Sequence, residues 1–203
     1  EKDKIGGLIF SIGTTKSHID WLNKFQSLSK TPLLVSMDAE WGPSQRLSDV
    51  FAHPWNMTLG AIQDNSLVRE ISKRMAEQNK ALGIHYNFSP SVDVNNNSKN
   101  PIIGNRSFGE DPVNVYKKAK AYIQGHKDAG IFTSIKHFPG HGDTDKDSHK
   151  TLPIIKGDIK RLNSVELYPF KRLIEDGLAE SVMLAHLSVP ALDKVYPSSL
   201  SYK

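Results

Sequence analysis

The chain has 203 residues, of which 38% are hydrophobic and 24% charged, and these proportions are typical of one globular α/β domain. The net charge of +4 comes from scattered lysines and arginines, which argues against a nucleic-acid-binding surface. The absence of cysteine excludes disulfides and thiol chemistry, and no apolar run is long enough to span a membrane.

Strand-like and helix-like patterns alternate along the chain. The strand-like runs are short and apolar, whereas the helix-like segments have one apolar face and end at glycine or before proline. In chain order we predict a strand at 5–10, a helix at 17–28, a strand at 32–37, a polar loop at 39–64, a helix at 65–82, a strand at 84–89, a helix at 112–129, a strand at 131–135, a helix at 158–176 broken near Pro169, and a last strand at 181–185.

This alternation predicts parallel strands joined by crossover helices. The strands after the first end at or near polar residues, namely Asp38, Asp93, Lys136 with His137, and His186. Such a layout is typical of a (β/α)8 TIM barrel with its site at the carboxyl ends of the strands. A doubly wound sheet is the alternative, but no glycine-rich phosphate loop follows the first strand. We therefore predict one domain over residues 1–203, an incomplete TIM barrel with about five of the eight strands.

Residues 136–149, KHFPGHGDTDKDSH, combine three histidines with three aspartates in a predicted loop after a strand. Asp147 could accept a hydrogen bond from His149, leaving the other imidazole nitrogen free to transfer a proton. A zinc site is a second interpretation, in which the ligands are chosen from His137, His141, Asp143, Asp147 and His149. Proline and glycine inside the His-x-x-x-His spacing disfavour it. A polar loop whose histidines only bond the backbone is the third.

The order of residues in this segment resembles the β-N-acetylglucosaminidases of glycoside hydrolase family 3. The resemblance rests on KHFPGHGDT at 136–144, DSH at 147–149 and LP at 152–153. It implies that His149 is the general acid/base and that Asp147 orients it. It also implies that Lys136 and His137 bind sugar hydroxyls. Most retaining glycosidases use a carboxylic acid where this resemblance assigns a histidine.

Two further motifs resemble the same family. DAEWGPSQRL at 38–47 implies that Asp38 and Arg46 hold the sugar, with Trp41 replacing a usual glycine and free to stack on a sugar ring. NRSFGEDP at 105–112 implies that Arg106 reaches the sugar. The alternatives are a turn residue for Asp38, a surface charge for Arg46 and a structural ion pair for Arg106.

The remaining candidates lie at other strand ends. VMLAH at 182–186 resembles the family strand that precedes the nucleophile strand, which makes Met183 and His186 candidate substrate-binding residues. Asp93 is interpreted as structural or supporting. We expect the other histidines, together with two tryptophans, to be core or surface groups: His18, His53, His85, His126, Trp21 and Trp55.

The resemblance implies a nucleophilic aspartate on a strand after 182–186, but the last aspartate, Asp193, lies in a context that does not match. We therefore expect an internal piece of a longer protein, inactive alone, whose nucleophile lies beyond Lys203. A fused C-terminal domain in that longer protein is a further expectation. The chain does not indicate a compartment.

The predicted function is a retaining exo-β-N-acetylglucosaminidase that acts on peptidoglycan- or chitin-derived sugars without a metal or organic cofactor. Its predicted partner is a carbohydrate substrate, not nucleic acid. A family 3 β-glucosidase, a metal-dependent hydrolase and a noncatalytic sugar-binding barrel are the alternatives.

Overall fold

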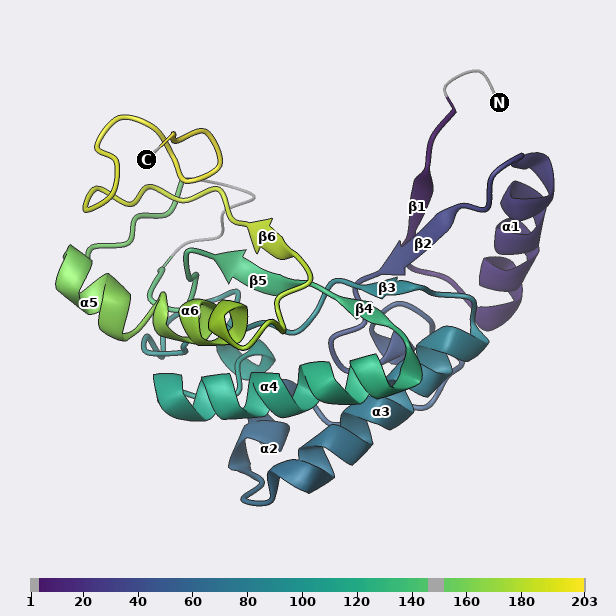
Figure 1. Cartoon of the computed structure of the whole chain (residues 1–203), viewed down its shortest axis with the longest axis horizontal. Coiled ribbons are helices and arrows are strands. Elements are labelled where there is room, and N and C mark those ends of the chain that lie inside the picture. The colour runs from purple at the N-terminus through teal and green to yellow at the C-terminus, as the bar shows by residue number, and fades with distance from the viewer. Residues whose placement is uncertain (1–3, 146–151, 203) are drawn as a thin grey trace.

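A computed structural model describes residues 4–145 and 152–202 of the chain. Short parallel strands lie above a layer of helices in which α3 and α4 run side by side (Figure 1). The strands are β1 (Gly7–Phe10), β2 (Leu34–Met37), β3 (Tyr86–Asn87), β4 (Phe132–Thr133), β5 (Ile135–Phe138) and β6 (Val182–Leu184). The α-helices are α1 (Thr15–Leu28), α2 (Asn56–Ala61), α3 (Asn65–Ala81), α4 (Pro112–Ala129), α5 (Ile159–Ser164) and α6 (Tyr168–Glu175). Two 3-10 helices are η1 (Pro43–Gln45) and η2 (Gly104–Arg106).

All the strand pairs are parallel, in the orders β1-β2-β3-β4 and β5-β6. The two sheets adjoin, because only Ser134 separates β4 from β5 and because β5 bonds to the segment that follows β3. There, Lys136 N donates to Pro90 O at 3.2 Å, and Val92 N donates to Lys136 O at 2.7 Å. The predicted mixed α/β architecture with parallel strands is confirmed.

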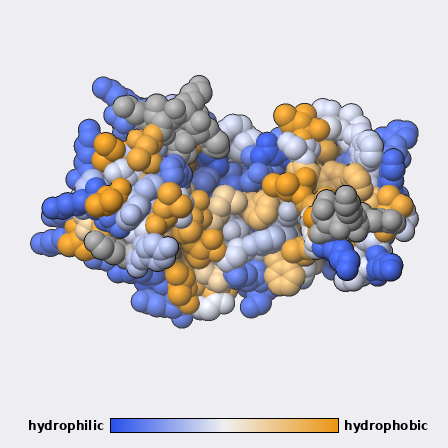
Figure 2. Space-filling model, turned by 90° about the horizontal axis from the view of Figure 1, so that it is seen from above, coloured by the Kyte–Doolittle hydropathy of each residue, from blue (hydrophilic) through white to orange (hydrophobic). Residues whose placement is uncertain are grey.

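The register of the strands separates two faces of the sheet. Ile9 and Phe132 belong to one cross-strand row and are 62% and 55% exposed. Met37 and Asn87 belong to the neighbouring row, which faces the helices, and are completely buried. The side of the molecule away from α3 and α4 shows apolar surface among polar regions (Figure 2). One face of the strands is therefore packed on helices, and the other carries exposed apolar side chains.

Helix ends follow the predicted capping signals. Asp111 caps α4 by accepting from Asn114 N at 2.7 Å, and Pro112 occupies the first turn. The helix ends at Gly130, whose φ of 78° is left-handed and therefore suits glycine. Asp158 caps α5 in the same way, through Arg161 N at 2.8 Å. None of the helices in the described ranges combines the length and apolarity needed to cross a membrane.

Several predicted boundaries are wrong. The strand predicted over 131–135 is divided between β4 and β5. The loop predicted over 39–64 contains α2, which the sequence did not indicate because its start has no capping side chain. Tertiary contacts hold α2 instead, since Leu59 is completely buried and Asn56 Nδ2 donates to Arg106 O at 2.7 Å. The strand predicted over 84–89 shortens to β3. The loop predicted from residue 136 starts later, because pairing with β6 keeps Lys136 and His137 in β5.

The helix predicted over 158–176 is broken, as expected, into α5 and α6. Pro169 lies in the first turn of α6, where its missing N–H costs no intrahelical bond.

Candidate active site

Charged residues after β2 and in β5 form one connected group, which we call the strand-end cluster. Lys136 Nζ lies 2.9 Å from Asp38 Oδ1 and 2.8 Å from Glu40 Oε1. Arg46 Nη2 donates to the other Asp38 oxygen at 2.8 Å. The cluster continues through Arg106, and its members are Asp38, Glu40, Arg46, Asp93, Arg106, Lys136 and His137.

Arg106, in η2, grips Glu40 with two nitrogens. Its Nη2 lies 2.6 Å from Glu40 Oε1, and its Nε donates to both carboxylate oxygens at 3.1 and 3.2 Å. The same Nη2 lies 3.2 Å from His137 Nε2. A guanidinium can only donate, so His137 Nε2 accepts and its proton resides on Nδ1. That Nδ1 lies 2.7 Å from Asp93 Oδ2 and donates to it.

The carboxylates of the cluster are held ionised. Burial opposes the charge of Glu40, but Lys136 and Arg106 outweigh it and lower its pKa to about 2. Burial also opposes ionisation of Asp38, and Lys136 and Arg46 again bring its pKa below the ordinary value. For Arg106, burial works against the charged form, but Glu40 raises its pKa. Three cations, Lys136, Arg46 and Arg106, therefore face ionised carboxylates.

Asp93 is completely buried and supports the residues around it. Burial opposes its charge, but bonds from His137 Nδ1, His141 N at 2.6 Å and Ser91 Oγ at 2.8 Å lower its pKa well below the ordinary range. The prediction that Asp93 is a supporting residue agrees with these bonds.

The segment after β5 packs tightly on the segment after β3. A Cβ on Gly142 would lie 1.7 Å from Val94 O, so only glycine fits there. Asn100 Nδ2 donates to His141 O at 2.7 Å and to Gly142 O at 3.0 Å. The beginning of the predicted catalytic loop is thus fixed against the cluster. Asp147 and His149 lie outside the described residues, and their role as acid/base pair stays a prediction.

The two candidates from β6 and its end lie differently. Met183 is half-buried and pairs in register with Lys136, which places it beside the cluster. His186 is exposed, and its Nδ1 lies 2.6 Å from Ser199 Oγ. Within the described ranges, no hydrogen bond joins His186 to the cluster. The structure therefore brings together Asp38, Arg46, Arg106, Lys136 and His137, with Met183 adjacent.

The zinc interpretation gains no support from the described residues, where no three His, Cys, Asp or Glu side chains are grouped as metal ligands. His137 Nδ1 is engaged by Asp93, and His141 Nδ1 lies 2.5 Å from Thr144 Oγ1. Asp143 lies 3.2 Å from Arg161 instead.

Sequence reasoning missed Glu40, which joins Lys136 to Arg106 and is only 1% exposed. The available signal was its spacing, because residues two apart at a strand end point to the same side. Trp41, one residue further, stacks on Trp55 with ring centroids 4.1 Å apart and 11° between the planes. One ring face of Trp41 is therefore occupied, and stacking on a sugar stays a prediction.

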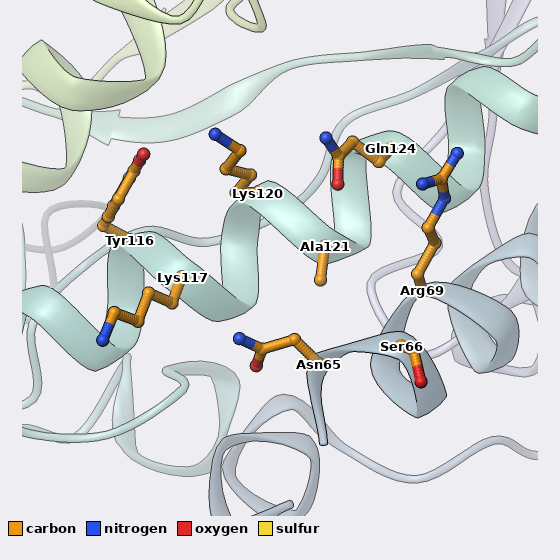
Figure 3. A pocket seen from close by; sticks show the side chains of 8 residues that line it. All are labelled: Asn65, Ser66, Arg69, Tyr116, Lys117, Lys120, Ala121 and Gln124. Carbon is orange, nitrogen blue, oxygen red and sulfur yellow. The ribbon is translucent and has the colours of Figure 1, made fainter. Parts of the chain in front are cut away.

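A separate groove of about 450 Å³ lies between α3 and α4 (Figure 3). Its cations are largely neutralised, since Arg69 binds Asp128 and Lys120 binds Asp176. We call it the α3–α4 groove; its lining residues are Asn65, Ser66, Arg69, Tyr116, Lys117, Lys120, Ala121 and Gln124. None of them belongs to the strand-end cluster, which is the better candidate for an active site.

Comparison with known proteins identifies relatives of this chain. "Beta-hexosaminidase A" of Pseudoalteromonas piscicida is 36% identical over 194 residues, which cover 88% of this chain and 32% of that protein. The solved structure of a glycoside hydrolase family 3 β-N-acetylglucosaminidase from Paenibacillus sp. str. FPU-7 superimposes with a TM-score of 0.91 at 38% identity, covering 98% of this chain and 40% of that one. The β-glucoside phosphorylase BglX superimposes with a TM-score of 0.90 at 29% identity, covering 97% and 38%.

The chain thus spans 32% and 49% of the length of two curated relatives that it matches, from Pseudoalteromonas piscicida and Thiobacillus denitrificans. All of its residues, 1–203, match the family model described as "Glycosyl hydrolase family 3 N terminal domain". The chain belongs to glycosyl hydrolase family 3.

Proposed function

We propose that the protein containing this chain is a retaining exo-β-N-acetylglucosaminidase that removes terminal β-linked N-acetylglucosamine from peptidoglycan- or chitin-derived sugars. The observation that carries the proposal is the strand-end cluster in a chain whose relatives are named β-hexosaminidases. We further propose that the parallel strands are part of a (β/α)8 barrel. The exposed apolar row containing Ile9 and Phe132 would then lie inside the closed barrel.

The cluster has the chemistry to hold a neutral polyol. Sugar hydroxyls both donate and accept, and ionised carboxylates beside cations offer both kinds of partner. Asp38, Arg46 and Arg106 keep 23%, 27% and 21% of their side chains exposed, so a ligand can reach them. Lys136 and Glu40 are 2% and 1% exposed, and they hold Asp38 and Arg106 in place through ion pairs. In this proposal the accessible residues bind hydroxyls, assisted by His137, Met183 and His186.

The proposed chemistry follows the retaining scheme. His149, oriented by Asp147, protonates the leaving glycosidic oxygen while an aspartate on a segment that follows β6 in the longer protein attacks the anomeric carbon. His149 then takes a proton from water, which releases the sugar and restores the aspartate. No metal or organic cofactor is required.

A β-glucoside specificity is the second candidate, favoured by the similarity to the β-glucoside phosphorylase BglX. In that case glucosides would be cleaved faster than N-acetylglucosaminides, and phosphate would compete with water as acceptor. A noncatalytic sugar-binding role would leave both substrates intact.

The test is release of aryl alcohol from aryl β-N-acetylglucosaminides and β-glucosides by the complete natural polypeptide. We expect cleavage of the N-acetylglucosaminide, indifferent to chelator and to added phosphate. A general acid matters most when the leaving group is basic. His149→Ala should therefore lose activity on an alkyl glycoside by about a hundredfold or more, but far less on a dinitrophenyl glycoside. An equal loss on both, or none, would contradict the role of His149.

A further inference from the structure

A second buried network lies behind the strand-end cluster, on the helix-facing side of the sheet. Asn87, at the end of β3, bonds both backbone groups of Ala39 with its side-chain amide. Its Oδ1 accepts from Ala39 N at 3.0 Å, and its Nδ2 donates to Ala39 O at 3.0 Å. Ala39 lies between Asp38 and Glu40, the two carboxylates that bind Lys136. The amide therefore fixes the backbone that carries both of them.

His126, in α4, fixes Asn87 in turn. Its Nε2 lies 3.0 Å from Asn87 Nδ2. Because Nδ2 is a donor, His126 Nε2 accepts and the imidazole proton resides on Nδ1. That Nδ1 lies 2.8 Å from Ser72 Oγ, and the Ser72 hydroxyl donates to Tyr122 O at 2.6 Å. Each donor in this series of hydrogen bonds has an acceptor.

Tyr122 closes the network on the backbone carbonyl of Glu40. Its hydroxyl donates to Glu40 O at 3.0 Å, and its ring stacks on His126 with centroids 4.5 Å apart. The side chains of the network are completely buried: Ser72, Asn87, Tyr122 and His126. Burial lowers the pKa of His126 to about 3, so its imidazole is neutral at pH 5 and above.

We propose that His126 is a positioning residue, which acts through Asn87 and Tyr122 to fix the backbone of residues 39–40. It thereby directs Asp38 and Glu40 to Lys136 and Asp38 to the bound sugar. Its effect on hydrolysis rests on the proposed function. Sequence reasoning had placed His126 among core or surface groups, because nothing in the sequence reveals its partners on α3 and β3. Small displacements of a binding group cost a large part of catalysis, so the network matters beyond stability.

Two substitutions separate positioning from packing. Both remove the stacked ring, but the amide oxygen of His126→Gln reaches the place of Nε2 and can accept from Asn87 Nδ2. The shorter amide of His126→Asn reaches only the place of Nδ1, beside Ser72. In the complete natural polypeptide, we expect the Asn variant to lower kcat/KM by about tenfold or more and the Gln variant to stay within about threefold of wild type. Melting temperatures should fall to a similar extent in both.

His18 supplies the matched control, a 3% exposed histidine whose Nε2 bonds Leu82 O at 2.9 Å, away from the network. We expect His18→Asn to lose stability but keep kcat/KM. Equal kcat/KM values for the two His126 variants at equal folded fraction would overturn the proposal.

A spectroscopic measurement tests the hydrogen bonds of the network independently of hydrolysis. In the 15N-histidine-labelled polypeptide, the signal lost in His126→Gln should report a neutral imidazole protonated on Nδ1 that does not titrate between pH 5 and 9. An Nε2–H tautomer or a titrating ring would contradict the hydrogen bonds assigned to His126 in the network. A wild-type protein that cleaves neither glycoside would contradict the proposed function. The tautomer of His126 would still show whether the hydrogen-bond network exists.

Discussion

The strand-end cluster and the α3–α4 groove both contain charged side chains, but water reaches them very differently. Lys136 and Glu40 are 2% and 1% exposed and share their charges with Asp38 and Arg106. In the groove, Arg69 is 48% and Lys120 39% exposed, and each has one carboxylate partner. The burial of the charges and the sharing of ion-pair partners, rather than the number of charges, therefore distinguish a candidate site from a solvated surface.

The physical reason is the cost of removing charge from water. A buried charge needs its partner, because an uncompensated charge in the interior is strongly destabilising. An exposed ion pair is screened by solvent and salt, and losing it changes little. Substitutions of the same type in the two regions should therefore have very different effects on stability.

The largest effect is expected for Lys136→Met, which leaves Asp38 and Glu40 without their common cation. We expect it to lower the free energy of unfolding by roughly 3–5 kcal/mol, measured by urea denaturation. The control is Lys120→Met, which removes the same charge from the groove and should have a far smaller effect. Similar losses of unfolding free energy in both variants would show that burial does not make the ion pairs of Lys136 more important than an exposed pair.

The next effect is a dependence of stability on pH. Folding lowers the pKa of Glu40 from its ordinary 4.5 to about 2, so the ionised form stabilises the fold above pH 4.5. That stabilisation, roughly 3 kcal/mol, is lost as the pH falls from about 4.5 toward 2, and Asp38 contributes in the same direction. Urea unfolding at pH 6, 5, 4 and 3 should show this decline.

Glu40→Gln should be less stable than wild type at pH 6 but flatter between pH 5 and 3. Glu77→Gln, at an exposed helix position, serves as control and should keep the wild-type slope. An unchanged slope in Glu40→Gln would contradict the assignment of the pH dependence to this carboxylate.

The smallest effect is expected for His186→Ala. His186 is exposed and bonds Ser199, so its removal should leave the melting temperature unchanged. As a proposed substrate contact at the edge of the site, it should raise KM for the aryl N-acetylglucosaminide by only about threefold to tenfold. A loss comparable with that of a cluster residue would mean that His186 belongs to the centre of the site.

The sequence could predict what depends on local patterns. Asp111, Pro112 and Gly130 mark the ends of α4, and periodicity marks α3. The alternation of strands and helices predicts the parallel strands whose ends carry Asp38 and Lys136. The sequence could not predict α2, which tertiary contacts hold without a capping side chain.

The sequence also could not reveal the partners that make Glu40 and His126 important. Their importance comes from partners 66 and 39 positions away in the chain, at Arg106 and Asn87. Such partners are brought together only by folding. A short motif can identify the family, but the supporting residues must be located in the structure.

Matched substitutions of two arginines test most directly whether the strand-end cluster binds the sugar. Arg106 and Arg69 each grip a carboxylate with two nitrogens, one in the cluster and one in the groove. A lysine keeps the charge but loses this fork. Calorimetric titration of N-acetylglucosamine into the complete polypeptide should show binding weakened about tenfold or more in Arg106→Lys and unchanged in Arg69→Lys. Unchanged affinity in Arg106→Lys, with the protein folded, would contradict the account.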